Sequence, residues 1–221
     1  MWEGYVYGSI SNAFNLSKME TYGPIDVAVV ATSDDAHFEP LKQLAEYPLK
    51  LVIAEKPLCA DLRQAREIVA LYREKGIPLA VNYTRRFIPE LQELKRRYEA
   101  GEFGELKEYS IAFNRGLLHT GSHAVDFMNW FFNGEENDCL VVNEIKGLEY
   151  RLWQIQIFFE HYHWCEERIG DQPVPSYADH HMRYVAENAH NFLEGRESLK
   201  CTGEDSLKAL EICFELMGAK K

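Results

Sequence analysis

The chain has 221 residues, enough to bury a sizeable core as one large domain or two small ones. Hydrophobic residues make up 46% and charged residues 27%, which is ordinary for a globular protein, and the formal net charge is −11. An acidic chain without a strongly basic cluster is a poor match for nucleic acid or for an anionic membrane surface, so we expect neither partner.

The cysteine and histidine patterns argue against a secreted or metal-binding protein. The five cysteines show no Cys-x-x-Cys pairing, and no signal peptide or long apolar run is visible, which favours a reducing cytoplasm. His161 and His163 fall on one face of an expected strand, but no cysteine or carboxylate nearby completes a metal site. We therefore expect these histidines, and the pair at 180–181, to be surface or core residues.

Residues 1–25 have weak patterns, with a possible short strand at 5–7 and a weak helix at 11–19. The stretch that follows alternates clearly between strand and helix patterns. Short strand patterns, made almost entirely of apolar residues, occupy 27–31, 51–54 and 79–82. Between them lie two helical patterns, the second framed by a capping box at Asp61 and Gln64 and by Gly76. This alternation predicts a parallel sheet with crossover helices.

Polar residues follow each of the three expected strands. In parallel sheets, ligands bind beyond the carboxyl ends of the strands. The sequence therefore predicts a site at this edge, formed by Thr32, Glu55, Lys56, Pro57, Asn82 and Tyr83.

After a further helix that begins at Pro89, the pattern changes to strand alternation from residue 106, and glycines at 101 and 104 mark a domain boundary. We expect domains 1–103 and 104–221. The second should be an α+β domain with an open, mostly antiparallel sheet and C-terminal helices. In its segment 152–164, one face carries Trp153, Ile155 and Ile157, and the opposite face is expected to carry Phe158, Tyr162 and Trp164.

Three blocks of the sequence, in this order, resemble the glucose–fructose oxidoreductase / inositol dehydrogenase (Gfo/Idh/MocA) family: residues 26–32 with His37, residues 55–57, and residues 82–87. The resemblance extends over residues 20–134. It implies an α/β fold with a Rossmann-like sheet, and an NAD- or NADP-dependent oxidoreductase that acts on a sugar or cyclitol hydroxyl.

The resemblance also assigns roles at the strand ends. Lys56 matches a lysine near the nicotinamide and the substrate hydroxyl, where a partly buried amine can exchange a proton; the alternative is a surface lysine in a turn. His123 matches a histidine beside the substrate, unless it only packs or caps a helix. His119 stands where many members have aspartate. It can orient or shuttle a proton, but it cannot supply a fixed negative charge near Lys56.

Further family positions complete the candidate site. Besides the catalytic candidates Lys56, His123 and His119, the resemblance implies cofactor contacts from Thr32, His37, Glu55 and Pro57, and a cis peptide at that proline. Substrate contacts are implied for Asn82, Tyr83, Arg86 and Asp126. For Arg86 a structural ion pair is the alternative.

One family feature is missing from this sequence. Members begin with a strand, a Gly-x-Gly-x-x-Gly turn, a helix and a second strand with a ribose-binding acid, but Gly4 and Gly8 lack that spacing. We therefore expect an N-terminally truncated, incomplete Rossmann-like sheet that binds the cofactor weakly. The alternatives are a non-catalytic sugar-binding or oligomer-forming remnant, and a sequence that starts late. A homo-oligomer formed through the sheet of residues 106–164 is also expected.

Overall fold

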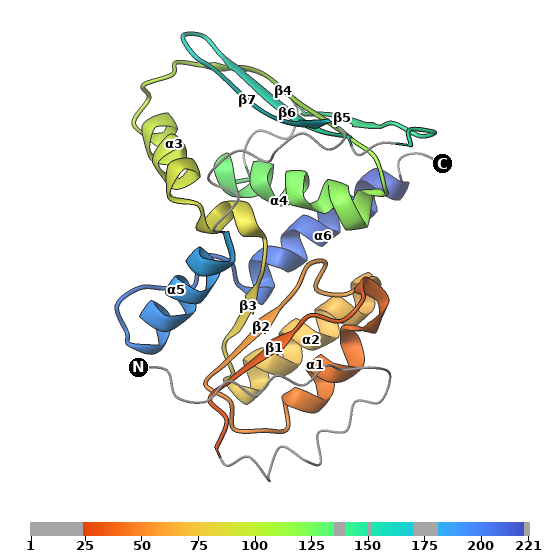
Figure 1. Ribbon diagram of the computed structural model, residues 1–221, viewed down its shortest axis with the longest axis vertical. Coiled ribbons are helices and arrows are strands. Elements are labelled where there is room, and N and C mark those ends of the chain that lie inside the picture. The colour runs from red at the N-terminus through yellow and green to blue at the C-terminus, as the bar shows by residue number, and fades with distance from the viewer. Residues whose placement is uncertain (1–23, 135–139, 150–151, 170–180, 219–221) are drawn as a thin grey trace.

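The computed structural model describes residues 24–134, 140–149, 152–169 and 181–218. Two sheets lie at opposite ends of the molecule, with helices between them (Figure 1). One sheet has three strands and the other has four. The α/β architecture predicted from the sequence is confirmed.

The three-stranded sheet is parallel, as the alternation of patterns predicts. Strands β1 (Val27–Val30), β2 (Leu51–Ala54) and β3 (Leu79–Val81) pair in that order. Helices α1 (Phe38–Leu44) and α2 (Leu62–Lys75) form the crossovers and pack together beside the sheet (Figure 1). All three strands therefore end at the same edge of the sheet.

Both faces of β2 are covered, which explains its continuous apolar run. Val52 and Ala54 pack into the main core with α1 and α2, whereas Leu51 packs on the other side with Ala80 and with Ala189 of α5 (His181–Leu193). A strand that is buried on both faces has no polar face, so its sequence does not alternate.

Helix α2 begins and ends where the sequence predicts. The Asp61 carboxylate accepts hydrogen bonds from the backbone N–H groups of Arg63 and Gln64, at 2.8 and 3.2 Å. Gly76 ends the helix with φ of +66°, a left-handed conformation that favours glycine. A cap of this kind contributes about 1 kcal/mol to helix stability.

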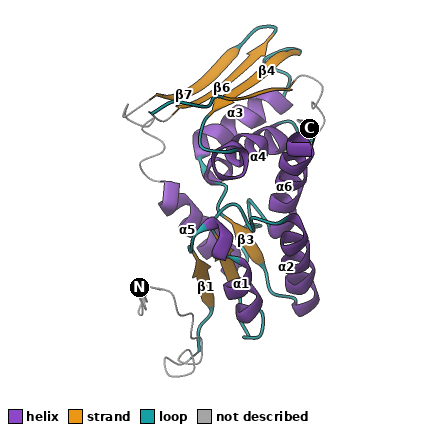
Figure 2. Cartoon of the chain, turned by 90° about the vertical axis from the view of Figure 1, so that its right-hand side faces the viewer, coloured by secondary structure: helices purple, strands orange, loops and turns teal. Residues whose placement is uncertain are grey.

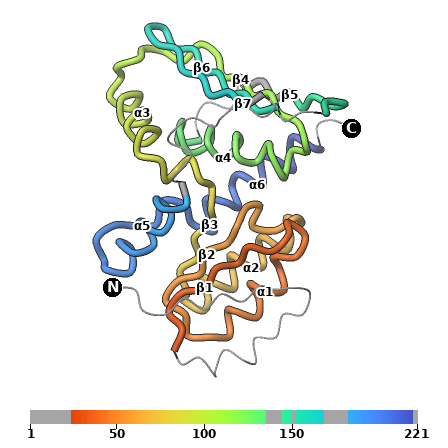
Figure 3. Tube along the Cα trace, in the orientation of Figure 1, coloured from red at the N-terminus to blue at the C-terminus, as the bar shows by residue number. Residues whose placement is uncertain are grey.

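The C-terminal part of the chain returns to the first sheet. The Val81 N–H donates to the Cys201 carbonyl at 3.1 Å, and Thr202 then starts α6 (Gly203–Gly218) through a reciprocal cap with Asp205. Helix α6 packs against α2 and also against α4 (Ser122–Phe131). It therefore joins the two halves of the molecule (Figure 3).

The four-stranded sheet is open and mostly antiparallel, as predicted. Its order is β5-β4-β6-β7, and only the β4–β5 pair is parallel. The strands are β4 (Leu106–Phe113), β5 (Leu140–Glu144), β6 (Leu152–Phe159) and β7 (His163–Ile169). Helices α3 (Pro89–Glu99) and α4 lie under one face of the sheet (Figure 2).

The faces predicted for Tyr162 and Trp164 are wrong. Trp164 pairs with Ile157 across the sheet, and its ring centroid lies 5.5 Å from that of Phe127 in α4, on the inner face. Tyr162 stacks on Phe103 at 4.3 Å. The prediction assumed a continuous strand over 152–164, but the chain reverses after Phe159, and the reversal changes which residues share a face. The outer face carries Phe158, which is 36% exposed.

Two of the four histidines weighed as metal ligands, His161 and His163, have described side chains. His161 lies in the turn between β6 and β7, whereas His163 stacks on Phe158 at 4.3 Å. His180 and the side chain of His181 lie outside the described residues. Among the described residues, no group of three or more histidine, cysteine or acidic side chains is placed to hold a metal ion. None of the helices in the described ranges has the length and apolar character needed to span a bilayer.

Candidate active site

The carboxyl ends of β1 and β2 lie beside a turn from the other half of the chain. β1 leads into η2 (Asp34–Ala36), and β2 leads into Glu55 and the cis Lys56–Pro57 peptide, which confirms the cis bond that the resemblance implies. Facing them is η4 (Leu117–Gly121), a π-helical turn directly before α4. The candidate site is built across this junction.

Lys56 links β2 to η4. Its Nζ donates a hydrogen bond to the main-chain carbonyl of His119 at 2.7 Å, and the residue is only partly exposed. The two residues are 63 positions apart in the chain. The structure thus brings together two of the three residues predicted to be catalytic.

The His119 ring has a partner that the sequence analysis did not identify. Its Nδ1 lies 2.6 Å from Oδ2 of Asp34, in the turn after β1. The side chains are 58% and 36% exposed, so solvent reaches both. Asp34 lies in the polar turn that follows the first strand, and this position is the signal that could have identified it.

His37 is buried and ties together the two turns that follow β1 and β2. Its Nδ1 lies 2.8 Å from the Pro57 carbonyl oxygen, and its Nε2 lies 3.0 Å from the Thr32 carbonyl oxygen. A neutral imidazole has one N–H and therefore donates to one of these carbonyls at a time. The position favours a role in shaping the turns. The Thr32 hydroxyl is also engaged, because it donates to the Ala36 carbonyl at 3.0 Å.

Asn82 fixes the orientation of Glu55. Its Nδ2 donates to Oε1 of Glu55 at 2.7 Å, and its Oδ1 accepts a hydrogen bond from the Thr84 hydroxyl at 3.2 Å. Asn82 is 4% exposed and stands just before η3 (Thr84–Phe87). The ends of β2 and β3 are therefore joined by side chains as well as by the strand ladder.

Tyr83 and His123, which the resemblance assigns to one site, are in contact. Their ring centroids are 5.9 Å apart in an edge-to-face arrangement, with His123 in the first turn of α4. Tyr83 is buried, and this burial raises the pKa of its hydroxyl well above the usual value. Tyr83 is therefore protonated at neutral pH and forms a wall behind the His123 ring.

A second wall beside His123 comes from residues that the sequence analysis missed. The Trp153 ring lies edge-on to His123, with centroids 6.3 Å apart, and the Arg85 guanidinium lies 4.3 Å from the centroid of the Trp153 ring. Both Arg85 and the indole N–H of Trp153 donate to the buried carboxylate of Glu166. Arg85 and Glu166 are 81 positions apart, so no local pattern connects them.

Arg86 and Asp126 form a buried ion pair with each other. The guanidinium donates to both carboxylate oxygens at 2.8–3.1 Å, and the residues are 3% and 1% exposed. Burial raises the pKa of Asp126 to about 6, although Arg86 opposes this shift. Arg86 also lies 3.5 Å from Asp205 of α6. This geometry favours the structural alternative for Arg86 over a direct substrate contact.

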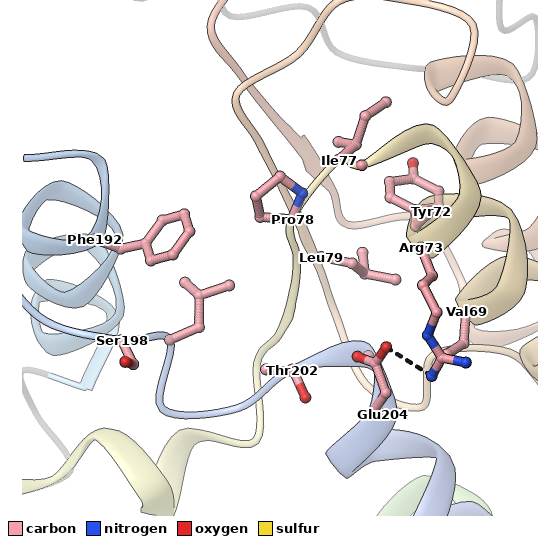
Figure 4. A pocket seen from close by; sticks show the side chains of 13 residues that line it. Val69, Tyr72, Arg73, Ile77, Pro78, Leu79, Phe192, Ser198, Thr202 and Glu204 are labelled. Atoms are coloured by element: carbon pink, nitrogen blue, oxygen red, sulfur yellow. Dashed lines mark hydrogen bonds and ion pairs between the residues drawn. The ribbon is translucent and has the colours of Figure 1, made fainter. Parts of the chain in front are cut away.

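A cavity of about 400 Å³ lies at the other end of β3, away from these residues. It lies between α2, the start of β3 and the segment that follows α5 (Figure 4). Arg73 and Glu204 form an ion pair of 3.0 Å on one side of it. The remaining walls are mainly apolar, from Val69, Tyr72, Ile77, Pro78, Leu79, Phe192 and Leu199.

Around the ends of β1 and β2, the polar side chains of Thr32, Glu55 and Lys56 lie at the carboxyl edge of the sheet, each in a hydrogen bond with the protein. A pyrophosphate needs a glycine-rich turn that lets the backbone approach it at a helix N-terminus. Residues 24–75 contain no glycine, and the short turn after β1 carries two acidic side chains. The described part of this sheet therefore offers no pyrophosphate cradle.

Comparison with known sequences points to one family. The Gfo/Idh/MocA family model, an oxidoreductase family with an NAD-binding Rossmann fold, matches residues 6–83. The chain is 32% identical over 109 residues to the Escherichia coli oxidoreductase YhhX, and 40% identical over 82 residues to inositol 2-dehydrogenase of Mycolicibacterium smegmatis. These matches cover 49% and 37% of this chain, but only 31% and 24% of the relatives. The chain thus matches about a third or less of their length.

Solved structures share the fold over more of the chain. The myo-inositol dehydrogenase of Corynebacterium glutamicum matches with a TM-score of 0.70 at 15% identity, over 90% of this chain and 79% of that protein. GenD2 from gentamicin A biosynthesis, solved in complex with NAD, matches with a TM-score of 0.72 at 14% identity, over 91% and 78%. At these identities the likeness establishes the fold alone.

Proposed function

We propose that this chain, which belongs to the Gfo/Idh/MocA oxidoreductase family, serves in the nicotinamide-dependent oxidation or reduction of a sugar or cyclitol at a hydroxyl-bearing carbon. The observation that carries the proposal is the convergence of Lys56 and His119 at the carboxyl edge of the parallel sheet. That edge is where ligands bind in folds of this type. Two curated relatives are named inositol 2-dehydrogenase, which supports a cyclitol or a similar polyol as substrate.

Each residue has a distinct part in the proposed site. A nicotinamide cofactor would supply the hydride chemistry. The Lys56 amine and the His119 ring would hold or move the hydroxyl proton. His123, backed by Tyr83 and Trp153, would orient the substrate ring. Glu55, which accepts a hydrogen bond from Asn82, would line the part of the site that holds the cofactor. The turns that His37 joins would line it as well.

Turnover is the direct test of this function. The purified chain would be supplied with millimolar NAD⁺ or NADP⁺ and with a panel of inositols and hexoses, and cofactor reduction would be followed by absorbance. We expect substrate-dependent reduction with at least one polyol. Absence of reduction with every member of the panel would count against the proposal.

A non-catalytic sugar-binding protein is the second candidate, and it is favoured by the lack of a glycine-rich turn in this sequence. The two candidates differ in whether the polyol binds without a cofactor and in whether binding leads to turnover. A binding protein would take up the polyol in calorimetry without any cofactor and would show no turnover. The oxidoreductase would show turnover that depends on cofactor concentration.

We predict that this polypeptide binds NAD⁺ and NADP⁺ only weakly. Two charge-assisted hydrogen bonds to pyrophosphate are worth about 3–6 kcal/mol together, and their loss raises a Kd of about 1 μM roughly 10²–10⁴-fold, to about 0.1–10 mM. Isothermal titration calorimetry with each cofactor measures this directly. A Kd of a few micromolar for either cofactor would contradict the prediction.

We also predict a homo-oligomer formed through the outer face of β4, β6 and β7. Phe158 is 36% exposed on this face and stacks on His163, so a Phe158→Glu variant should split the assembly. Light scattering should give about twice 25.7 kDa for the wild type and 25.7 kDa for the variant. Val29→Glu is the matched control, because Val29 is 59% exposed on the other sheet. A monomeric wild type at micromolar concentration would refute the prediction.

A further inference from the structure

The contact between Asp34 and His119 joins two parts of the chain that lie 85 positions apart. Asp34 lies in the turn after β1, in the first sheet, and His119 lies in η4, directly before α4. The carboxylate Oδ2 is 2.6 Å from the ring Nδ1, a distance typical of a short, charge-assisted hydrogen bond. An ionised carboxylate only accepts, so the Nδ1 atom carries the hydrogen in this contact.

We infer that Asp34 is a positioning residue that sets the tautomer and the orientation of His119 for the reaction, an assignment that rests on the proposed function. With the hydrogen on Nδ1, the neutral ring has its lone pair on Nε2. That atom is then the one that accepts a hydrogen bond, and a proton, from a substrate hydroxyl. The carboxylate stabilises the imidazolium that forms when Nε2 takes up the proton.

The geometry also provides the negative charge that His119 itself lacks. The imidazole of His119 carries no fixed negative charge, and the Asp34 carboxylate supplies one at 2.6 Å from its Nδ1 atom. Because Lys56 donates to the backbone carbonyl of the same histidine, Asp34, His119 and Lys56 form one connected group. The carboxylate, the imidazole and the amine come from the ends of β1, η4 and β2.

An ordinary surface ion pair is the competing explanation, because the two side chains are 36% and 58% exposed. Such a pair contributes little to stability and leaves both side chains free to rotate. Here His119 is held at two points, by its ring on Asp34 and by its carbonyl on Lys56. The Lys56 contact holds the backbone at His119 and the Asp34 contact holds the ring, so under the positioning explanation the direction of Nε2 depends on the Asp34 carboxylate.

The test measures the tautomer, so it does not depend on turnover. Long-range ¹H–¹⁵N NMR spectra of the imidazole nitrogens, assigned with a His119→Gln variant, give the ratio of the Nδ1–H to the Nε2–H form at high pH. We expect the Nδ1–H form to dominate in the wild type. In Asp34→Asn the amide can donate to Nδ1, and the ratio should fall about tenfold.

The matched control is Asp35→Asn, one position further along the same turn. It removes the same charge, but the Asp35 carboxylate accepts a hydrogen bond from the Ser33 hydroxyl at 2.7 Å rather than from His119. We expect Asp35→Asn to keep the wild-type tautomer ratio. An unchanged ratio in Asp34→Asn, or an equal change in Asp35→Asn, would overturn the inference.

Turnover is the second measurement. Together with the tautomer ratio, it shows whether the positioning role of Asp34 or the proposed oxidoreductase function fails. With an active polyol, Asp34→Asn should lower kcat about tenfold and leave KM within about twofold, because the altered contact acts on proton transfer. If Asp34→Asn changes the tautomer ratio but neither the wild type nor any variant shows turnover, the result supports the Asp34 contact as the feature that sets the tautomer. The same result counts against the proposed oxidoreductase function. Wild-type turnover with equal kcat in Asp34→Asn would overturn the positioning role.

Discussion

Replacing Asp126 with alanine is expected to lower the free energy of unfolding by about 3–5 kcal/mol, because it leaves the Arg86 guanidinium buried without its main partner. The side chain of Arg86 is only 4% exposed, and its remaining partner, Asp205, lies 3.5 Å away. Arginine does not lose its proton in proteins, so the uncompensated charge stays in the core. Urea unfolding followed by circular dichroism measures the loss as a lower midpoint at a similar slope.

Two controls separate the charge effect from a simple loss of packing. In the double variant Arg86→Met, Asp126→Leu, apolar side chains replace both partners, and we expect most of the lost stability to return. Glu67→Ala removes a surface pair with Lys42, whose side chains are each 50% exposed, and should cost less than about 1 kcal/mol. If Asp126→Ala stays within about 1 kcal/mol of the wild type, the ion pair does not hold the fold together in the way its burial indicates.

The features predicted correctly from the sequence are those with local causes. The three parallel strands come from short apolar runs separated by helical patterns, and each run needs only its own residues to be recognised. The ends of α2 follow from Asp61 and Gly76 in the same way. Lys56 was assigned to the strand edge because the carboxyl ends of parallel strands share one edge, a rule of topology that needs no coordinates.

The features that were missed depend on contacts between distant segments. Asp34 meets His119 across 85 positions, and Arg85 meets Glu166 across 81, so neither pair has a sequence period or spacing. The error at Trp164 has a related cause. Alternation predicts which residues share a face only within one strand. The turn of three residues after Phe159 shifts the alternation, so Trp164 lies on the inner face and not on the outer one.

We expect Lys56→Met to lower kcat/KM for an active polyol by about 10²–10⁴-fold, the usual contribution of a general acid or base. Methionine keeps the length and much of the apolar stem, but it removes the amine that donates to the His119 carbonyl at 2.7 Å. Lys56→Arg should be nearly as impaired, because a guanidinium keeps the charge and does not exchange its proton. Steady-state kinetics at one fixed millimolar cofactor concentration, the same for every variant, measure both effects.

Lys50→Met is the matched control for this prediction. Lys50 precedes the same strand at its amino end and pairs with Asp26 at 3.0 Å, but its side chain is 67% exposed and lies at the opposite edge of the sheet from the candidate site. Its removal should leave kcat/KM within about twofold of the wild type, because exposed ion pairs contribute little. If Lys56→Met were as active as Lys50→Met, the amine would serve only to tie β2 to η4, and proton transfer would have to rest on His119 with Asp34.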